Sequence, residues 1–185
     1  MTNSIALNTA TIKSRTFTTF LAVVAAVALP QIFHVVGVAS GLGSSLGAAF
    51  LPMQLPVFLA GFLAGPIVGL IVGIVSPLIS FSFSGMPSAV MLPNMIAEIA
   101  GYGLVAGLLC NVKMPTIGKL LIAQLVGHAL KALAILISVY ALGEATAPVA
   151  LIWSSVTAGL PGILLQWSLI PLIMFWVGNR KNSHV

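Results

Sequence analysis

The sequence predicts an all-α integral membrane protein with six transmembrane helices joined by short loops. Of its 185 residues, 59% are hydrophobic and only 5% are charged, whereas a soluble domain carries about 25% charged residues. A chain with so few polar residues cannot cover an apolar interior in water. This composition excludes a water-soluble globule, a nucleic-acid-binding domain and a disordered tail, and it makes lipid the natural solvent.

The length of the apolar region sets the number of spans. A spanning helix needs about 20 residues, so the roughly 160 residues from Phe17 to Gly178 hold about six helices. Glycines, prolines and polar clusters interrupt the apolar stretches and divide them into helices. The predicted helices of this single membrane domain, residues 1–185, are 16–36, 47–65, 67–83, 89–110, 117–141 and 149–177.

The first predicted helix follows two basic residues, Lys13 and Arg15, and contains Pro30. A cleaved signal peptide is the alternative for this region, but the apolar run continues past Pro30, which favours a membrane span. Ala22 and Ala26 lie one turn apart on this helix, among bulkier residues. Such a pair of small residues either packs inward or forms a docking surface for another membrane protein, and the periodicity favours neither.

The second and third predicted helices are short and are joined only by Gly65 and Pro66. They contain three prolines, Pro52, Pro56 and Pro77. A re-entrant pair that enters and leaves the membrane on one side is therefore the alternative to two spans. Gly65, Gly69 and Gly73 recur at four-residue spacing and predict a smooth ridge against a neighbouring helix. Small residues of the fourth helix predict a matching face: Ala97, Gly101, Gly103 and Gly107.

Charged side chains interrupt the fourth and fifth predicted helices at similar depth. Glu98 and Lys131 each lie about nine or ten residues from the outer end of their helix, which is roughly 14 Å at a rise of 1.5 Å per residue. A charge at the bilayer centre costs about 2.5–3.5 kcal/mol on insertion scales, so both residues need a function or a partner. Polar residues follow one face of each helix: Asn94, Glu98 and Tyr102 on the fourth, and Gln124, His128 and Lys131 on the fifth.

The sixth predicted helix adds Trp153, Gln166 and Trp167. Two polar stripes at one depth, closed by these residues, predict a shared polar cavity that binds a ligand. The alternative is a Glu98 to Lys131 ion pair that only holds two helices together. The predicted substrate-binding residues are Asn94, Glu98, Tyr102, Gln124, His128, Lys131, Trp153 and Gln166.

Basic residues determine the predicted orientation. With six spans and a cytoplasmic N-terminus, most of the basic residues fall on the cytoplasmic side, and the positive-inside rule favours this topology in the cell membrane. Both termini are then cytoplasmic, Glu144 lies outside, and the formal charge of +5 reflects topology rather than affinity for nucleic acid. The basic residues on the cytoplasmic side are Lys13, Arg15, Lys113, Lys119, Arg180 and Lys181.

The motifs of metalloenzyme and other metal sites are missing from the sequence. The single Cys110 excludes a disulfide framework and a cysteine-based metal site. No His-Glu-x-x-His and no paired aspartates occur, and no catalytic residue, metal or cofactor is predicted. The polar residues gather in the outer halves of the helices, which favours a binding pocket open to one side. An autonomous small-molecule carrier and an intramembrane enzyme are the alternatives from other classes.

Several segments carry a resemblance to a known family. They are the pair Ala22 and Ala26, Phe50-Leu-Pro-Met-Gln-Leu-Pro-Val-Phe-Leu-Ala-Gly-Phe, Gly85-Met-Pro, and Glu98-Ile-Ala-Gly-Tyr-Gly-Leu-Val-Ala-Gly. With six short-looped helices, these segments resemble the substrate-binding S component of an energy-coupling factor (ECF) vitamin transporter. The resemblance covers essentially the whole chain, although Gln54 stands where many members of the family have His.

The resemblance implies an outward-facing vitamin site built mainly from helices 4 to 6 and closed by the loop after helix 1. It also implies that Ala22 and Ala26 dock a transmembrane T subunit, which two cytosolic ATPases drive. The sequence contains no P-loop motif, which agrees with an energy source in other chains.

The side chains of the predicted cavity narrow the choice of substrate. One carboxylate, one amine, one imidazole and several aromatic rings suit a small heteroaromatic vitamin with a protonatable ring or amino group. A pyridoxine or hydroxymethylpyrimidine type of substrate is therefore predicted. Pantothenate, whose carboxylate could pair with Lys131, or another vitamin is the alternative.

Overall fold

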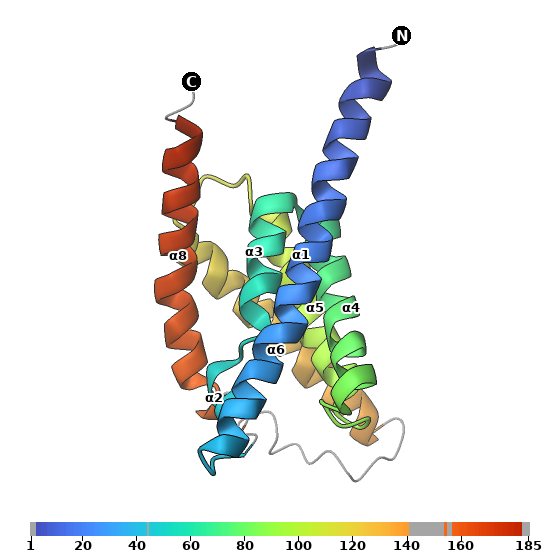
Figure 1. Cartoon of the computed structure of the whole chain (residues 1–185), viewed down its shortest axis with the longest axis vertical. Coiled ribbons are helices and arrows are strands. Elements are labelled where there is room, and N and C mark those ends of the chain that lie inside the picture. The colour runs from blue at the N-terminus through green and yellow to red at the C-terminus, as the bar shows by residue number, and fades with distance from the viewer. Residues whose placement is uncertain (1–2, 44, 141–153, 155–156, 183–185) are drawn as a thin grey trace.

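The computed structural model describes residues 3–43, 45–140, 154 and 157–182. Within these ranges the chain forms helices and no strand (Figure 1). This agrees with the all-α fold that the composition predicts. The helices are α1 (Asn3–Ala39), α2 (Ser45–Phe50), α3 (Gln54–Ala64), α4 (Pro66–Ser84), α5 (Leu92–Leu108), α6 (Thr116–Tyr140) and α8 (Leu160–Asn182).

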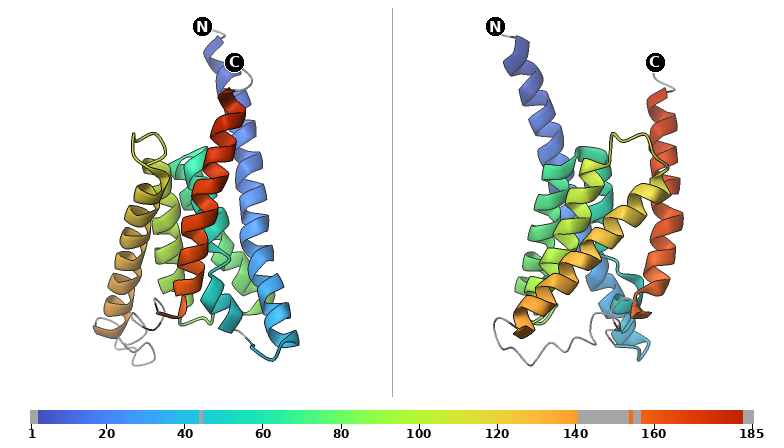
Figure 2. Two further views of the ribbon diagram at one scale, coloured as in Figure 1. Left: turned by 90° about the vertical axis from the view of Figure 1, so that its left-hand side faces the viewer. Right: turned by 180° about the vertical axis from the view of Figure 1, so that it is seen from behind.

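The helices run alternately between two ends of the molecule. Figures 1 and 2 show the start of α1, the end of α8 and the connection from α5 to α6 at one end. The connections that follow α1 and α4 lie at the other end. Among the described residues, five stretches are long and apolar enough to cross a membrane, and α5 is an apolar helix of 17 residues beside them. The chain is thus a multi-pass membrane protein with five to six spans.

Large apolar side chains cover the outside of this bundle. Phe17 and Phe20 of α1, Leu125 of α6 and Phe175 of α8 are each exposed over 65–69% of their surface. Soluble monomers rarely expose apolar patches of this kind, whereas lipid tails are a favourable environment for them. The distribution of apolar side chains therefore supports a bilayer as the surrounding medium.

Helix α5 lies at the centre and packs against α3, α4 and α6. Its contact with α4 depends on glycine, because a Cβ atom on Gly69 would overlap the backbone of Gly103, and the reverse also holds. Gly73 meets the backbone of α5 at Ile99 and Ala100 in the same way. The predicted ridge is confirmed at Gly69 and Gly73, which bring the backbones of α4 and α5 into direct contact. Gly65 instead caps the start of α4, and Gly101 packs against α6.

The second predicted helix, 47–65, is divided into α2 and α3. Leu51 has a positive φ of 48°, and Pro52 follows it. Because a proline disfavours the α conformation in the residue before it, the helix ends here and restarts at Gln54. The break decides which way Gln54 points, and this residue contributes to a polar cluster described below.

Two other boundaries differ from those predicted. The first helix extends beyond 16–36 to Asn3–Ala39, since a helix that is already nucleated adds further residues at little cost. The last helix was predicted to begin at residue 149, whereas α8 begins at Leu160, next to Pro161, a residue suited to the first turn of a helix. Residues 149–153 of that predicted span lie outside the described residues. The helices predicted at 67–83, 89–110 and 117–141 match α4, α5 and α6 within three residues at each end.

Candidate functional site

A buried carboxylate lies at the contact between α5 and α6. The side chain of Glu98 is only 4% exposed. Its Oε1 accepts a hydrogen bond of 2.7 Å from the Tyr102 hydroxyl and lies 2.9 Å from Nδ1 of His128. Its Oε2 lies 2.9 Å from Nζ of Lys131. We call Glu98, Tyr102, His128 and Lys131 the Glu98 cluster.

Helical spacing and close packing bring the Glu98 cluster together. Glu98 and Tyr102 are four residues apart on α5, so they lie on one face of that helix. Gly127 of α6 lies directly against the Tyr102 ring and leaves no room for a side chain. Because α6 approaches α5 so closely at this glycine, the side chains of His128 and Lys131 reach the carboxylate.

Aromatic rings form one wall of the Glu98 cluster. Phe58 of α3 stacks on Tyr102 with ring centroids 4.9 Å apart. His128 meets Tyr102 edge to face at 5.7 Å, and the Tyr102 hydroxyl lies 3.1 Å from Nδ1 of the imidazole. These contacts orient the phenol and the imidazole around the carboxylate, which leaves little rotational freedom to either ring.

Exposure is divided unequally within the Glu98 cluster. The carboxylate is enclosed, whereas the side chains of Lys131 and His128 are 18% and 25% exposed. Glu98 and Lys131 compensate each other in charge, so the pair satisfies the requirement that charges inside a membrane have a partner. What the cluster presents outward is an ammonium, which donates hydrogen bonds, and an imidazole edge. When Nδ1 of His128 donates to Glu98, the neutral ring presents Nε2 as an acceptor, and only the imidazolium presents a second N–H.

A second group of polar side chains links α3, α6 and α8. Nε2 of Gln166 donates to Oε1 of Gln54 at 3.0 Å, and Nε2 of Gln124 donates to Oε1 of Gln166 at 2.9 Å. The indole Nε1 of Trp167 donates to Oε1 of Gln124 at 2.7 Å. The three glutamines are buried. We call these four residues the glutamine cluster.

The structure therefore distributes the predicted site residues over two clusters. Glu98, Tyr102, His128 and Lys131 come together as one group. Gln124 and Gln166, which were predicted to line the same cavity, instead bond to each other. Trp153 lies outside the described residues, so its predicted role stays a prediction.

Gln54 is the polar residue of these clusters that the predicted site did not include. It lies in the apolar run that begins at Phe50 and is buried at the start of α3. A lone amide inside an apolar run needs a hydrogen-bond partner when it is buried. That signal is available in the sequence, but the partner is not, because Gln166 lies 112 residues away.

Asn94 is buried without a partner. The residue is 1% exposed, and neither Oδ1 nor Nδ2 has a hydrogen-bond partner in the part of the chain that the structure describes. Asn94 precedes Glu98 by four residues and Gly101 by seven, so the three share one face of α5. Gly101 packs against Gly127 and Leu130 of α6. The Asn94 amide therefore faces α6, one helical turn from Glu98.

The two alanines of the predicted docking surface lie on the inner side of α1. Ala26 is completely buried, and Ala22 is half-buried against the same core. Of the two possibilities that the periodicity left open, Ala26 follows inward packing, because α1 lies against α3 and α4. Ala26 is therefore not available to a partner in this conformation, whereas Ala22 is partly accessible.

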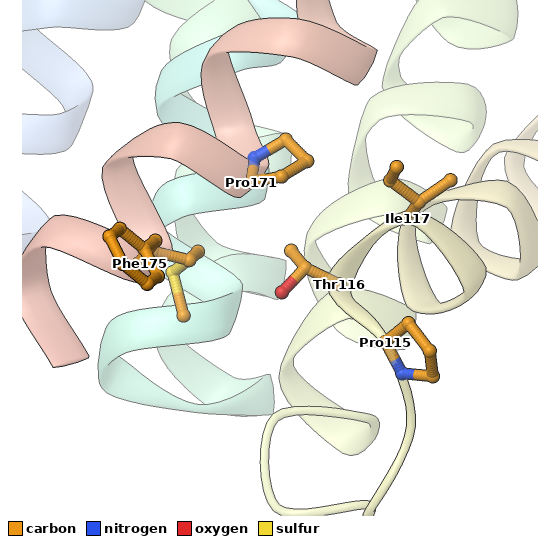
Figure 3. A pocket seen from close by; sticks show the side chains of 6 residues that line it. Pro115, Thr116, Ile117, Pro171 and Phe175 are labelled. Atoms are coloured by element: carbon orange, nitrogen blue, oxygen red, sulfur yellow. The ribbon is translucent and has the colours of Figure 1, made fainter.

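A hollow of about 440 Å³ opens at the other end of α6, away from the Glu98 cluster. Figure 3 shows Thr116 and Ile117 at the start of α6 facing Pro171 and Phe175 of α8. No ionisable side chain lines it. Its apolar lining differs from the polar cavity that the sequence predicted, and the prediction did not include this hollow. Among the described residues, no three His, Cys, Asp or Glu side chains form a group that could hold a metal ion.

Comparison with known families identifies the chain. The family model described as "ECF transporter, substrate-specific component" matches residues 13–174. No curated protein and no solved structure matches the chain. Since the matched region covers most of the sequence, the protein belongs to the family of ECF transporter substrate-specific components, as the resemblance indicated.

Proposed function

We propose that this protein is the S component that captures a small water-soluble vitamin, or a vitamin precursor, for import by an ECF-type transporter. Membership of the family supports the role of a substrate-binding transporter subunit. The observation that carries the proposed site is the Glu98 cluster, in which an enclosed carboxylate holds a partly exposed ammonium and imidazole. Ionisable groups inside a membrane are costly and by default mark a functional site.

The proposed orientation places both termini in the cytoplasm. Glu98 lies six residues after the start of α5 at Leu92, and Lys131 lies nine residues before the end of α6 at Tyr140. Both are nearer to the end of the bundle that is remote from the termini. In the proposed orientation the Glu98 cluster therefore lies in the outer half of the membrane, where a ligand arrives from outside.

The proposed roles of the site residues follow from their contacts. Lys131 and His128 bind the ligand directly, and Glu98 holds both side chains in place. The Tyr102 ring is fully buried between Phe58 and Gly127, and its hydroxyl orients the Glu98 carboxylate at the site. Gln124 and Gln166, which bond to each other, close the site on its inner side without a direct contact to the ligand. Asn94 and Trp153 complete the proposed set of ligand-binding residues.

Two types of substrate fit the composition of the site. A pyridoxine or hydroxymethylpyrimidine type would offer its ring nitrogen and hydroxyl groups to His128 and Lys131. Pantothenate would place its carboxylate on Lys131.

The proposed partners are a transmembrane T subunit and two cytosolic ATPases. The sequence has no P-loop of its own, so work has to come from other chains. Ala22, which is partly accessible on α1, is the residue that we propose for close contact with the T subunit. A docking role for Ala26 would require α1 to turn or to move away from α3 and α4.

Uptake and binding measured separately test this function. The purified protein alone should bind its vitamin without transporting it, and ATP-dependent uptake should appear only when the T subunit and ATPases are co-expressed. A mass-spectrometric search for a co-purifying small molecule identifies the vitamin. Uptake without any of those partners would favour an autonomous carrier, and chemical conversion of the ligand would favour an enzyme.

Labelling of single cysteines in intact cells tests the orientation. Cys110, the one native cysteine, lies in the connection from α5 to α6 and is first replaced by serine. A cysteine at Lys113 should then be protected from an impermeant reagent, whereas one at Glu144 should react. Labelling of position 113 from outside would contradict the proposed orientation.

A further inference from the structure

The hydrogen-bonding capacity of Glu98 is largely occupied within the protein. Its two carboxylate oxygens interact with Tyr102, His128 and Lys131, and the side chain is 4% exposed. Within the described ranges Glu98 is the one acidic side chain. A ligand that approaches the Glu98 cluster therefore meets the Lys131 ammonium rather than a free carboxylate.

The charged donor that remains for a ligand is the Lys131 ammonium. The Lys131 ammonium carries three N–H groups, and the Glu98 contact uses one of them. A ligand ammonium or pyridinium would face this charge with no free carboxylate beside it, and like charges repel strongly at low dielectric. A ligand carboxylate would instead accept hydrogen bonds from Lys131, and from Nε2 of His128 when both ring nitrogens carry a proton. Charge-assisted bonds of this kind are the strong ones.

The Asn94 amide supplies a second and independent indication of a ligand. A buried amide can donate two hydrogen bonds and accept two, and an unsatisfied one is destabilising. Both of its polar atoms lack partners among the described residues. Asn94 is one helical turn, roughly 6 Å, from Glu98 on the same face of α5. A neutral hydroxyl or amide of the ligand at about this distance from its acid group would satisfy it.

We propose that the ligand of the Glu98 cluster is an organic carboxylate whose acid group binds to Lys131 and His128 and whose hydroxyl or amide group binds to Asn94. The inference rests on the proposed function and selects one of its two substrate types. In this inference the negative charge of the substrate pairs with the Lys131 ammonium. Glu98 is then a positioning residue that holds the ammonium and the imidazole.

Matched pairs of compounds test the charge of the ligand directly. The purified protein is titrated with pantothenate and pantothenol, nicotinate and nicotinamide, biotin and biotinamide, and also with pyridoxine and thiamine. The tightest ligand should be a carboxylate, and its uncharged partner should bind at least about tenfold more weakly, as expected when a charge-assisted hydrogen bond is lost. Any ligand that co-purifies is released and methylated, and a gain of one methyl ester in its mass is expected.

Variants of Asn94 distinguish an anionic ligand from a cationic one, because a negative charge added at this position repels the first and attracts the second. Asn94→Asp should weaken binding of the carboxylate more than Asn94→Leu does, because it adds a negative charge near an anion. Asn94→Leu removes an unsatisfied amide, so it should fold at least as well as the natural protein and still lose affinity by about tenfold. If Asn94→Asp does not fold, Asn94→Leu alone decides whether the amide is an anchor.

The outcomes separate this inference from the proposed function. If the tightest ligand is cationic or uncharged, or if affinity rises in Asn94→Asp, the assignment of a carboxylate ligand is wrong. The proposed role as an S component would still stand. Unchanged affinity in Asn94→Leu would overturn the role of Asn94. A folded protein that neither retains nor binds any compound would overturn both proposals.

Discussion

Two buried polar clusters share helix α6 but differ in charge and in access. The glutamine cluster is neutral, and its amides and the Trp167 indole bond to one another across α3, α6 and α8. The Glu98 cluster contains the ion pair of Glu98 with Lys131, and its Lys131 and His128 side chains are 18% and 25% exposed. A neutral junction of amides is sufficient to join helices in a membrane. The proposed function gives the charges of the Glu98 cluster a reason that a structural junction does not require, namely binding of a ligand.

The energies of helix contacts in membranes also bear on the difference between the two clusters. Double-mutant cycles give modest values for interhelical hydrogen bonds in membranes, about 0.6 kcal/mol on average. A buried ion pair is not a more efficient junction, because the desolvation of two charges offsets their attraction. A protein that needed only a structural contact between α5 and α6 would gain little from Glu98 and Lys131.

The largest expected effect comes from breaking the ion pair on one side. Lys131→Met leaves the Glu98 carboxylate enclosed and unpaired, and Glu98→Gln leaves the ammonium without its counter-ion. Removal of one partner of a buried pair costs about 3–5 kcal/mol of folding free energy. Each variant should also weaken ligand binding by on the order of 2 kcal/mol or more. Thermal unfolding in detergent and calorimetric titration with the co-purifying ligand measure the two effects.

The double variant Glu98→Gln with Lys131→Met separates stability from binding. It removes both charges together, so most of the lost stability should return. Ligand binding should not return, because the ammonium is gone. Natural affinity in the double variant would show that the pair only joins two helices, which is the alternative that the sequence left open.

A smaller effect is expected in the glutamine cluster. Gln166→Leu removes the middle amide and leaves Gln54 and Gln124 each without one partner. The loss should lower the free energy of unfolding by on the order of 2 kcal/mol, since each unsatisfied buried group costs about 1–3 kcal/mol. Ligand affinity should change little, because this cluster bonds to itself.

Ser168→Ala is the matched control for Gln166→Leu. Its hydroxyl is exposed on the same helix and bonds only to carbonyls within α8. It should leave both stability and affinity unchanged. If Gln166→Leu instead abolished binding in a fully stable protein, the glutamine cluster would itself belong to the ligand site.

A still smaller effect is expected for Trp167→Phe. The substitution keeps an aromatic ring in place and removes only the indole donor to Gln124. One hydrogen bond contributes about 1 kcal/mol, so a shift of that size in unfolding free energy is expected. Comparison of Trp167→Phe with Gln166→Leu shows whether the cluster is held mainly by its centre or equally along its length.

The smallest effect on either cluster is expected for Ala22→Trp. Ala22 is half-buried on α1, a helix that contributes no residue to either cluster. Ligand affinity should stay within about twofold, whereas uptake with the T subunit and ATPases should be lost, because a bulky residue prevents close helix contact.

Ala26→Trp is the comparison variant for this experiment. Ala26 is fully buried in the core, so a large side chain there should destabilise the protein itself, by about 1–3 kcal/mol or more. Normal uptake in Ala22→Trp would remove Ala22 from the proposed docking surface. Normal stability in Ala26→Trp would show that α1 can move away from its neighbours.

Much of the fold was predictable because it depends on local quantities. Length, hydropathy and the positions of Gly and Pro predicted helices close to α4, α5 and α6. Glu98 and Lys131 were conspicuous because a charge inside a membrane is costly wherever its partner lies. The small-residue ridges were likewise visible as a four-residue spacing. Each of these inferences requires only the residues of one segment and the properties of lipid.

The partners of the polar side chains were decided by the tertiary structure. Gln124 and His128 lie one turn apart on α6, yet one bonds to α8 and the other to α5. The break at Leu51 turned Gln54 toward Gln166, and the packing of α1 placed Ala26 in the core. A sequence pattern gives the face of a helix on which a residue lies. Which neighbour that face meets depends on how helix backbones pack, and here glycine contacts such as Gly69 with Gly103 set that distance.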